Sequence, residues 1–267
     1  MPVDANLPIG VFDSGMGGLT VLAALRRALP AENFLYLGDT ARLPYGTKTP
    51  ATVSRYALQA ADQLVARGVK ALVVACNTAS AFALNDLQRA YAPLPVFGVV
   101  EPGAMAAARA ADARGVLVVA TESTISSGAY QRALTALRPR VPVYGRACPL
   151  WVTLAEQGEI GTAFVEAILR QGLRGYQRAG PGVLLLGCTH FPVFKAQLQA
   201  LVPGMQVVDS AETTAQVVAE ALAQRETLAV GAQGGVSFMA TDGCERFARV
   251  GRHFLGGPIA SVEWVEL

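Results

Sequence analysis

Two short segments of this chain, far apart in the sequence, share one pattern. Residues 71–78 read ALVVACNT and residues 183–190 read VLLLGCTH, so each apolar run is followed by a cysteine and then by polar side chains. Such an apolar run is typical of a strand buried on both faces of a parallel sheet. Ligands of open α/β sheets bind beyond the carboxyl ends of the strands. We therefore expect Cys76 and Cys188 to lie at two strand ends and to approach one ligand from opposite sides.

Two thiols that face each other across a small molecule suggest a particular chemistry. A thiolate removes a proton from one face of a carbon atom and a thiol returns a proton to the other face, which is general acid–base catalysis. The pKa of a free thiol is about 8.5 and falls near a positive group or a helix N-terminus. We expect each cysteine to lie just before a helix. The pattern favours a racemase without a cofactor, although a lone cysteine is often an inert core residue.

Composition limits the class of protein and its partners. Hydrophobic residues make up 52% of the 267 residues and charged residues 16%, which is typical of a chain with a large buried core. No apolar run approaches the roughly 18 residues that span a bilayer, and no secretory signal is evident, so we expect a cytoplasmic protein without a membrane partner. The net charge is +2 and no basic cluster is present, so we expect no nucleic-acid partner.

The cysteines also bear on metal binding and redox state. The chain has four of them, Cys76, Cys148, Cys188 and Cys244, and none is close to another in the sequence. No pair therefore has the spacing of a zinc site, and we expect no bound metal and four free thiols in a reducing compartment. Cys148 and Cys244 do not follow a strong predicted strand, so we expect them to be core residues.

Apolar runs and helical patterns alternate along the first hundred residues. Strands are predicted at 9–12, 33–37, 71–75 and 96–100, and helices at 19–29, 52–67 and near 79–90. Strand and helix in this order predict a parallel sheet with helices on both faces.

The pattern then starts again. GVLVVA at 115–120 is a second opening strand, followed by a hydroxyl-rich turn at 121–127. Ser14 and Thr121 are 107 positions apart and the two candidate thiols are 112 apart, and these similar offsets predict an internal repeat. We predict an α/β fold with two similar domains and a site in the cleft between them. Residues 1–98 with 207–267 form the first domain, including later strands at Val207–Asp209 and Val236–Ala240, and residues 99–206 form the second.

A glycine-rich turn, DSGMGG at 13–18, follows the first predicted strand. It invites a dinucleotide-binding interpretation, in which Asp39 would be the ribose-binding acid. Thr20 stands at the third glycine position, and the Asp13 carboxylate would repel a pyrophosphate. Asp13 suits a ligand ammonium group or a thiol proton better, and the alternative is that it caps the next helix.

Other polar residues near the predicted strand ends are weaker candidates. His190 follows Cys188 by two positions and would tune the thiol or bind a carboxylate. In the loop after the second strand, Tyr45 and the N–H of Gly46 would hold a side-chain carboxylate, or the loop is an ordinary proline-containing turn. Thr121 and Thr124 lie at the matching place in the second half. Glu156 has no local signature and, by itself, is expected to be a solvated helix charge.

Taken together, several segments resemble the glutamate racemases of the aspartate/glutamate racemase superfamily. The matching stretches are IGVFDSGMGGLTV (9–21), YLGDTARLPYGTKT (36–49), VVACNTASA (73–81), GVVEPG (98–103), CPLW (148–151), LLGCTHFP (185–192) and VDSAETTA (208–215). They cover most of the chain, and GVFDSGMGGL, LPYGTK, ACNTASA and GCTHFP are highly specific in combination.

The resemblance implies an isomerase that interconverts L- and D-glutamate without a cofactor and supplies D-glutamate for peptidoglycan of the cell wall. It implies a small-molecule substrate and a homodimer. It implies that Cys76 and Cys188 are the catalytic thiols and that Asp13, His190 and Glu156 assist them. The ligand-contacting set that it implies is Asp13, Ser14, Tyr45, Gly46, Asn77, Thr78, Thr189 and His190, to which Thr121 is added from its place in the repeat.

The chain departs from the family pattern at two places. Ser123 stands where a glycine is usual, and Thr153 stands where a proline is usual before the Glu156 helix. Three alternatives remain open at this point. They are another two-cysteine member acting on aspartate, a hydantoin or maleate, a nucleotide-binding dehydrogenase built on the glycine-rich turn, and a non-catalytic module that binds glutamate.

Overall fold

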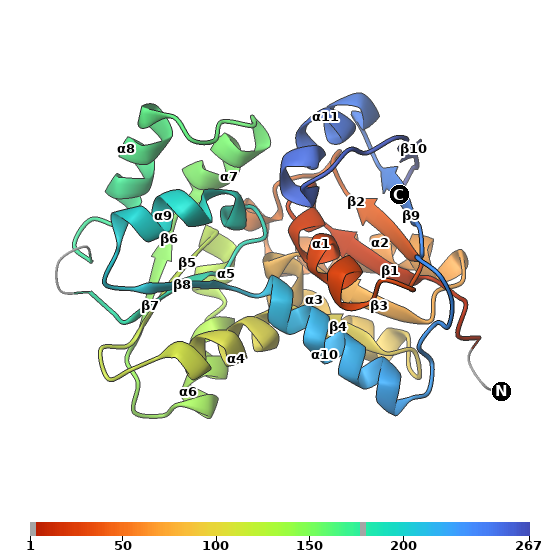
Figure 1. Ribbon diagram of the computed structural model, residues 1–267, viewed down its shortest axis with the longest axis horizontal. Coiled ribbons are helices and arrows are strands. Elements are labelled where there is room, and N and C mark those ends of the chain that lie inside the picture. Colours follow the sequence, from red (N-terminus) through yellow and green to blue (C-terminus); the bar gives the residue numbers. More distant parts are fainter. Residues whose placement is uncertain (1–3, 177–179) are drawn as a thin grey trace.

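The structure, a computed structural model, describes residues 4–176 and 180–267. Figure 1 shows two lobes side by side, each built on a parallel sheet with helices packed against it. The α/β architecture of two similar halves that the sequence predicts is therefore confirmed. Among the described residues, no helix is long and apolar enough to cross a bilayer.

The first lobe is built from both ends of the chain. Its six-stranded sheet has the order β10-β9-β2-β1-β3-β4, and its neighbouring strands are parallel throughout the described residues. The strands are β1 (Ile9–Asp13), β2 (Phe34–Gly38), β3 (Ala71–Val74), β4 (Val96–Gly98), β9 (Val236–Ala240) and β10 (Glu263–Trp264). β9 pairs with β2, which confirms that Val236–Ala240 completes the first half.

Helices cover both faces of this sheet. One face carries α1 (Leu19–Ala28), α10 (Ala211–Gln224) and α11 (Cys244–Leu255), and the other carries α2 (Pro50–Ala66) and α3 (Asn77–Ala90). Successive side chains of a strand point to opposite faces. Val11 of β1 accordingly packs in the first core and Phe12 in the second. A short 3₁₀ helix, η1 (Tyr45–Thr47), lies in the loop between β2 and α2.

The second lobe holds a four-stranded parallel sheet with the order β6-β5-β7-β8. Its strands are β5 (Val116–Ala120), β6 (Val143–Ala147), β7 (Val183–Leu186) and β8 (Gln206–Asp209). Its helices are α4 (Val100–Ala110), α5 (Glu122–Ser126), α6 (Ala129–Leu137), α7 (Pro149–Glu156), α8 (Ala163–Gly172) and α9 (Lys195–Leu201), with a 3₁₀ helix η2 (Phe191–Phe194) before α9.

The two sheets repeat one arrangement. In β2-β1-β3-β4 and in β6-β5-β7-β8, the opening strand of the half is central, the second strand lies on one side, and the third and fourth lie on the other. β3 and β7 therefore hold equivalent places, and each ends two residues before a candidate cysteine. The matching offsets in the sequence thus correspond to matching places in the fold.

Three local predictions differ from the structure. Val207–Asp209 pairs with β7, so the prediction that this segment completes the first sheet is wrong, and a domain boundary at residue 207 would cut through β8. The cause is the short α9 connection, which returns the chain to a place beside the strand it has just left. Val100 begins α4 and does not end a strand, and the predicted turn at 121–127 contains the helix α5, capped by Thr121.

Candidate active site

Cys76 lies between the end of β3 and the first turn of α3, where it is the N-cap residue. Its Sγ accepts the Ala79 N–H at 3.4 Å and donates to Oγ of Ser14 at 3.4 Å. Burial, together with the charge of Asp13, raises the pKa of the Cys76 thiol to about 12, although the Ser14 hydroxyl and the Ala79 N–H, which can both donate to a thiolate, oppose this rise. The predicted place at a helix N-terminus is confirmed. Without a ligand, this thiol keeps its proton at neutral pH.

Asp13 ends β1 and is completely buried. Its Oδ2 accepts the Gly15 N–H at 2.9 Å, and Thr189 Oγ1 donates to Oδ1 at 3.5 Å across the two lobes. Burial raises the pKa of Asp13, and the nearby charge of His190 and the backbone N–H groups oppose that rise. The N-cap residue of α1 is Gly18, so the alternative that Asp13 is the N-cap residue of this helix is wrong.

Cys188 lies two residues beyond β7 and is buried. Its Sγ is 3.7 Å from Nδ1 of His190. The charge of Cys188 contributes to the raised pKa of Cys76, because the two thiols lie in one buried region. The next helix is the 3₁₀ helix that begins at Phe191 with His190 as its N-cap residue, so Cys188 lies shortly before a helix but does not cap it as Cys76 caps α3. His190 supplies the polar neighbour of Cys188.

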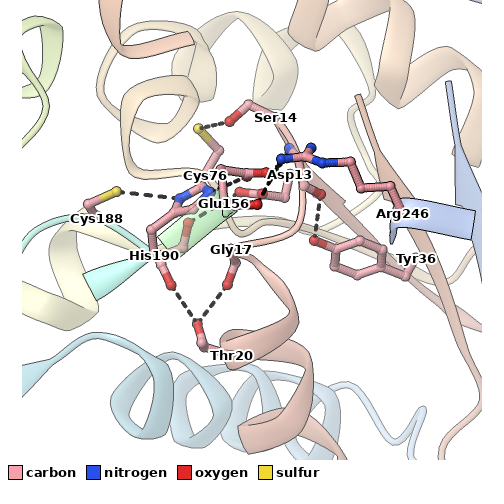
Figure 2. A network of polar contacts seen from close by, with 12 residues as sticks. Asp13, Ser14, Gly17, Thr20, Tyr36, Cys76, Glu156, Cys188, His190 and Arg246 are labelled. Atoms are coloured by element: carbon pink, nitrogen blue, oxygen red, sulfur yellow. Dashed lines mark hydrogen bonds and ion pairs between the residues drawn. The ribbon is translucent and has the colours of Figure 1, made fainter. Parts of the chain in front are cut away.

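A line of polar contacts leads from Cys188 through His190 to Glu156 (Figure 2). Nε2 of His190 is 2.6 Å from Oε1 of Glu156, and both residues are buried. Burial lowers the pKa of His190, but its contacts with Cys188 and Glu156 outweigh burial and raise that pKa well above its ordinary value. Burial raises the pKa of Glu156, and His190 and then Arg246 lower it below the ordinary value. The two residues therefore form a histidinium–carboxylate pair.

Glu156 is thus not the solvated helix charge that its local sequence suggests. It ends α7, and only 4% of its surface is exposed. Its place beside His190 agrees with the helper role that the resemblance implies. The sequence did not indicate this burial, because an acidic residue at the end of a helix does not reveal which residues of the other lobe are packed against it.

The glycine-rich turn is packed against the second lobe. A Cβ at Gly17 would lie 2.5 Å from Nδ1 of His190 and 2.5 Å from Oγ1 of Thr189, so only glycine fits there. Thr20 Oγ1 donates to the Thr189 carbonyl at 3.2 Å or to the Gly17 carbonyl at 2.9 Å (Figure 2). The carboxylate of Asp39 accepts from Arg42, Tyr45 and Thr241. These contacts oppose the dinucleotide-binding interpretation, since neither the turn nor Asp39 is open to a nucleotide.

Hydroxyl groups from the two lobes meet near the ends of β3 and β5. Oγ1 of Thr78 lies 3.0 Å from Oγ1 of Thr121 and 2.9 Å from Oγ1 of Thr124. Beside them, Oδ1 of Asn77 accepts from the Tyr130 hydroxyl at 2.6 Å. Nδ2 of Asn77 is buried without a hydrogen-bond partner. A buried donor without a partner is costly, so this amide is ready for an acceptor that a ligand brings.

The loop at 45–48 closes another side of this region. The Tyr45 hydroxyl donates to Asp39, and burial and the Asp39 carboxylate raise the pKa of Tyr45 far above its ordinary value. The tyrosine hydroxyl is therefore already hydrogen-bonded to Asp39. The group of this loop that can bind an anion is the backbone at Gly46. A Cβ at Gly46 would lie 2.5 Å from Cβ of Thr121, and Ser123 Oγ donates to the Gly46 carbonyl at 2.8 Å.

The structure brings together the residues that the sequence singled out and adds others. Every predicted site residue is buried, and the contacts above join them into one region at the carboxyl edges of both sheets. The additions are Thr20, Ser123, Tyr130 and Arg246. No local pattern marks them, because each acts across the lobes or from a surface helix. Thr124, one of the weaker candidates in the sequence, is a full member of the hydroxyl cluster.

Comparison with known proteins identifies the family. A sequence model described as Asp/Glu/Hydantoin racemase matches residues 9–218. This chain belongs to that family. Over 261 residues the chain is 48% identical to a glutamate racemase of Geobacter metallireducens, and the match covers 97% of this chain and 96% of the relative.

Solved structures of racemases have the same fold. A glutamate racemase of Francisella tularensis in complex with D-glutamate has a TM-score of 0.91 and 34% identity, with 98% of each chain covered. A glutamate racemase isoform of Bacillus anthracis has a TM-score of 0.93 and 35% identity, again with 98% of each chain covered. The racemase family and the two-lobed α/β fold predicted from the sequence motifs are confirmed.

Proposed function

We propose that this protein is an isomerase that interconverts L- and D-glutamate by a two-base reaction without a cofactor, supplying D-glutamate for peptidoglycan synthesis. The Geobacter and Francisella proteins, both with the name glutamate racemase, match nearly the whole chain at 48% and 34% identity. The Francisella relative binds D-glutamate. The site supports the same chemistry, as follows.

The observation that carries the proposal is the pair of thiols at equivalent strand ends, each with its own polar neighbours. Cys76 contacts Ser14 and lies beside Asp13, while Cys188 contacts His190. With one enantiomer, one thiolate takes the α-proton and the opposite thiol gives its proton to the other face of the planar carbanion. With the other enantiomer the two thiols exchange roles, so a full turnover consumes no cofactor.

The raised pKa of Cys76 has to be offset when substrate binds. Burial and the Asp13 charge hold the thiol protonated in the ligand-free protein. An amino-acid ammonium group between the lobes would lower the pKa of a nearby thiol, since an opposite charge favours the charged form. The substrate itself thus helps to generate the base that attacks it.

The remaining polar groups would hold the carboxylates of glutamate. Asn77 has an unpartnered buried amide N–H group, and Thr78, Thr121 and Thr189 offer hydroxyls nearby. The backbone at Gly46 lies beside Thr121 of this cluster and would meet the side-chain carboxylate. Because these groups are buried, the lobes have to move apart for substrate to enter.

The decisive experiment uses purified protein and L-glutamate in heavy water, with no added cofactor. Circular dichroism follows the loss of optical activity, and mass spectrometry follows deuterium at the α-carbon. We expect both signals to change together. Activity with aspartate, a hydantoin or maleate in place of glutamate would favour another member of the family. Glutamate binding without exchange of its α-proton would favour a binding module. Activity that depends on a nicotinamide cofactor would favour a dehydrogenase.

Cys76→Ser and Cys188→Ser should each lower racemisation by at least a thousandfold, because each removes the proton carrier on one face. Cys244→Ser is the matched control, since Cys244 is only partly buried at the start of α11 and should retain wild-type turnover. Turnover near the wild-type rate in either single active-site variant would contradict the two-thiol mechanism.

The proposal extends to assembly and location. We expect a homodimer, which light scattering after size exclusion measures directly, and a cytoplasmic enzyme, which fractionation of the host cell tests.

A further inference from the structure

Arg246 connects the C-terminal helix of the first lobe to the polar line in the second. It lies on α11, and its Nη2 donates to the backbone carbonyl of Glu156 at 2.7 Å. Its Nη1 lies 3.5 Å from Oε2 of the same residue (Figure 2). One guanidinium group therefore contacts both the last carbonyl of α7 and the carboxylate that faces His190.

Glu156 needs a second partner. Its Oε1 is taken by His190, while its Oε2 is buried without a hydrogen bond. A buried carboxylate is costly unless it is paired and hydrogen-bonded. Among the described residues, Arg246 is the one cation recorded within ion-pair distance of Oε2. Its charge lowers the pKa of Glu156 in the direction that His190 also favours.

We propose that Arg246 is a positioning residue for the reaction, which keeps Glu156 ionised and turned toward His190, and so acts on Cys188 without touching substrate. The inference rests on the proposed racemase function and goes beyond it, since it assigns to the C-terminal helix a part in the chemistry. It also makes the polar line complete only when both lobes are in contact, because Arg246 and Glu156 belong to different lobes.

The charge balance around Glu156 determines the sign of the expected effect. His190 from the segment after β7 and Arg246 from α11 favour its carboxylate form. Asp13 at the end of β1 carries a negative charge near Glu156. The Tyr36 hydroxyl on β2 is close enough to interact electrostatically with both carboxylates. Cys188 faces the other side of His190. Removal of the Arg246 charge leaves Glu156 with a higher pKa, so activity that needs the carboxylate disappears at a higher pH on the acid side.

The test compares Arg246→Met, Arg246→Lys and Arg249→Met. Arg249 is exposed one turn further along the same helix, so Arg249→Met makes the same charge change without touching Glu156. For Arg246→Met we expect kcat to be about tenfold lower and KM for glutamate to stay within about twofold of wild type. We expect the acid limb of kcat/KM to move up by about half to one pH unit. This shift is modest because the guanidinium is partly exposed. Arg246→Lys keeps the charge and should keep the acid limb in place. Arg249→Met should match wild type.

A second experiment, in the Glu156→Gln variant, distinguishes positioning of Glu156 by Arg246 from simple anchoring of α11. In Glu156→Gln, adding Arg246→Met should cause little further loss, because the partner on which Arg246 acts is already neutral. The inference is overturned if Arg246→Met keeps the wild-type acid limb, if Arg246→Lys moves it as far as methionine does, or if the two losses multiply. Racemisation by the wild-type protein is measured first, so failure of the proposed function itself is visible separately.

Discussion

At the residue scale, the two thiols are chemically different although their places in the fold are equivalent. Cys76 has a serine hydroxyl, a helix N–H and a nearby carboxylate, while Cys188 has a histidine that is itself paired with Glu156. The enzyme therefore presents unlike surroundings to the two faces of its substrate. We expect the residual racemisation of the two single cysteine variants to depend differently on pH.

The His190–Glu156 pair should make stability depend on pH in a defined window. The pKa of Glu156 is lowered in the fold from 4.5, so its contribution is present above that value and is lost as pH falls. The pKa of His190 is raised in the fold from 6.5, so its contribution is present below that value and is lost as pH rises through the raised pKa. Both contributions are therefore complete between pH 4.5 and 6.5.

Glu156→Gln should lower the free energy of unfolding by about 3 kcal/mol in this window, because it leaves a buried imidazolium without its partner. The loss should shrink as pH rises through the raised pKa of His190, because the imidazole then loses its charge. Urea unfolding at about pH 5.5 and about pH 10 measures it. Glu159→Gln, which removes an exposed carboxylate just after the same helix, is the control. An equal loss at both pH values would show that the pair is not ionised in the folded protein.

At the element scale, α5 holds the loop at 45–48 against the second lobe. Oγ of Ser123 is 2.8 Å from the Gly46 carbonyl and 3.2 Å from the Lys48 carbonyl. Both contacts join the two lobes, and both depend on the close approach that the glycine at 46 allows. Ser123 is therefore in direct contact with the loop proposed to bind the side-chain carboxylate.

Ser123→Ala should raise KM for glutamate about fivefold and leave kcat nearly unchanged, because one hydrogen bond of about 1 kcal/mol that positions the loop is lost. Ser126→Ala is a matched control in the same helix, since its exposed hydroxyl donates to the Ser123 carbonyl within that helix. Steady-state kinetics separate the two constants. A fall in kcat with unchanged KM would place Ser123 in the chemical step and not in binding.

At the scale of the whole molecule, a buried ion pair joins the two ends of the chain. Nζ of Lys70 lies 2.5 Å from Oε2 of Glu32 and donates to the carbonyls of Ala5 and Thr227 at 2.6 and 2.8 Å. Oε1 of Glu32 accepts the N–H of Ala229 at 2.8 Å. The pair lies at the opening ends of β2 and β3, the opposite edge of the sheet from the thiols, and it fixes the returning C-terminal segment.

Lys70→Met should lower the free energy of unfolding by about 3–5 kcal/mol, because it leaves the Glu32 carboxylate buried and unpaired. Lys70→Met with Glu32→Gln should recover part of this loss, since no unpaired charge remains. Chemical denaturation gives both values, and racemisation by the folded variants should remain near wild type. Equal stability of Lys70→Met and wild type would contradict a stabilising role for this ion pair.

Much of the fold and part of the candidate site can be predicted from short stretches of the sequence. Apolar runs that stop at Cys76 and Cys188, and a glycine-rich turn after the first strand, determine two parallel sheets with polar strand ends, because strand burial and tight turns leave periodic and compositional marks. The repeat offset of 112 positions would even have placed Val207–Asp209 in the second sheet, since it matches β4 to β8.

Only the tertiary structure decided how the lobes complete each other's chemistry. Glu156 and Arg246 are 90 positions apart, and neither has a local pattern that distinguishes it from a solvated helix charge. Their roles come from the approach of α11 to the end of α7, where Arg246 contacts the buried Glu156. A strand carries its burial in its own residues, whereas the partner of a buried charge depends on which distant surface is packed against it.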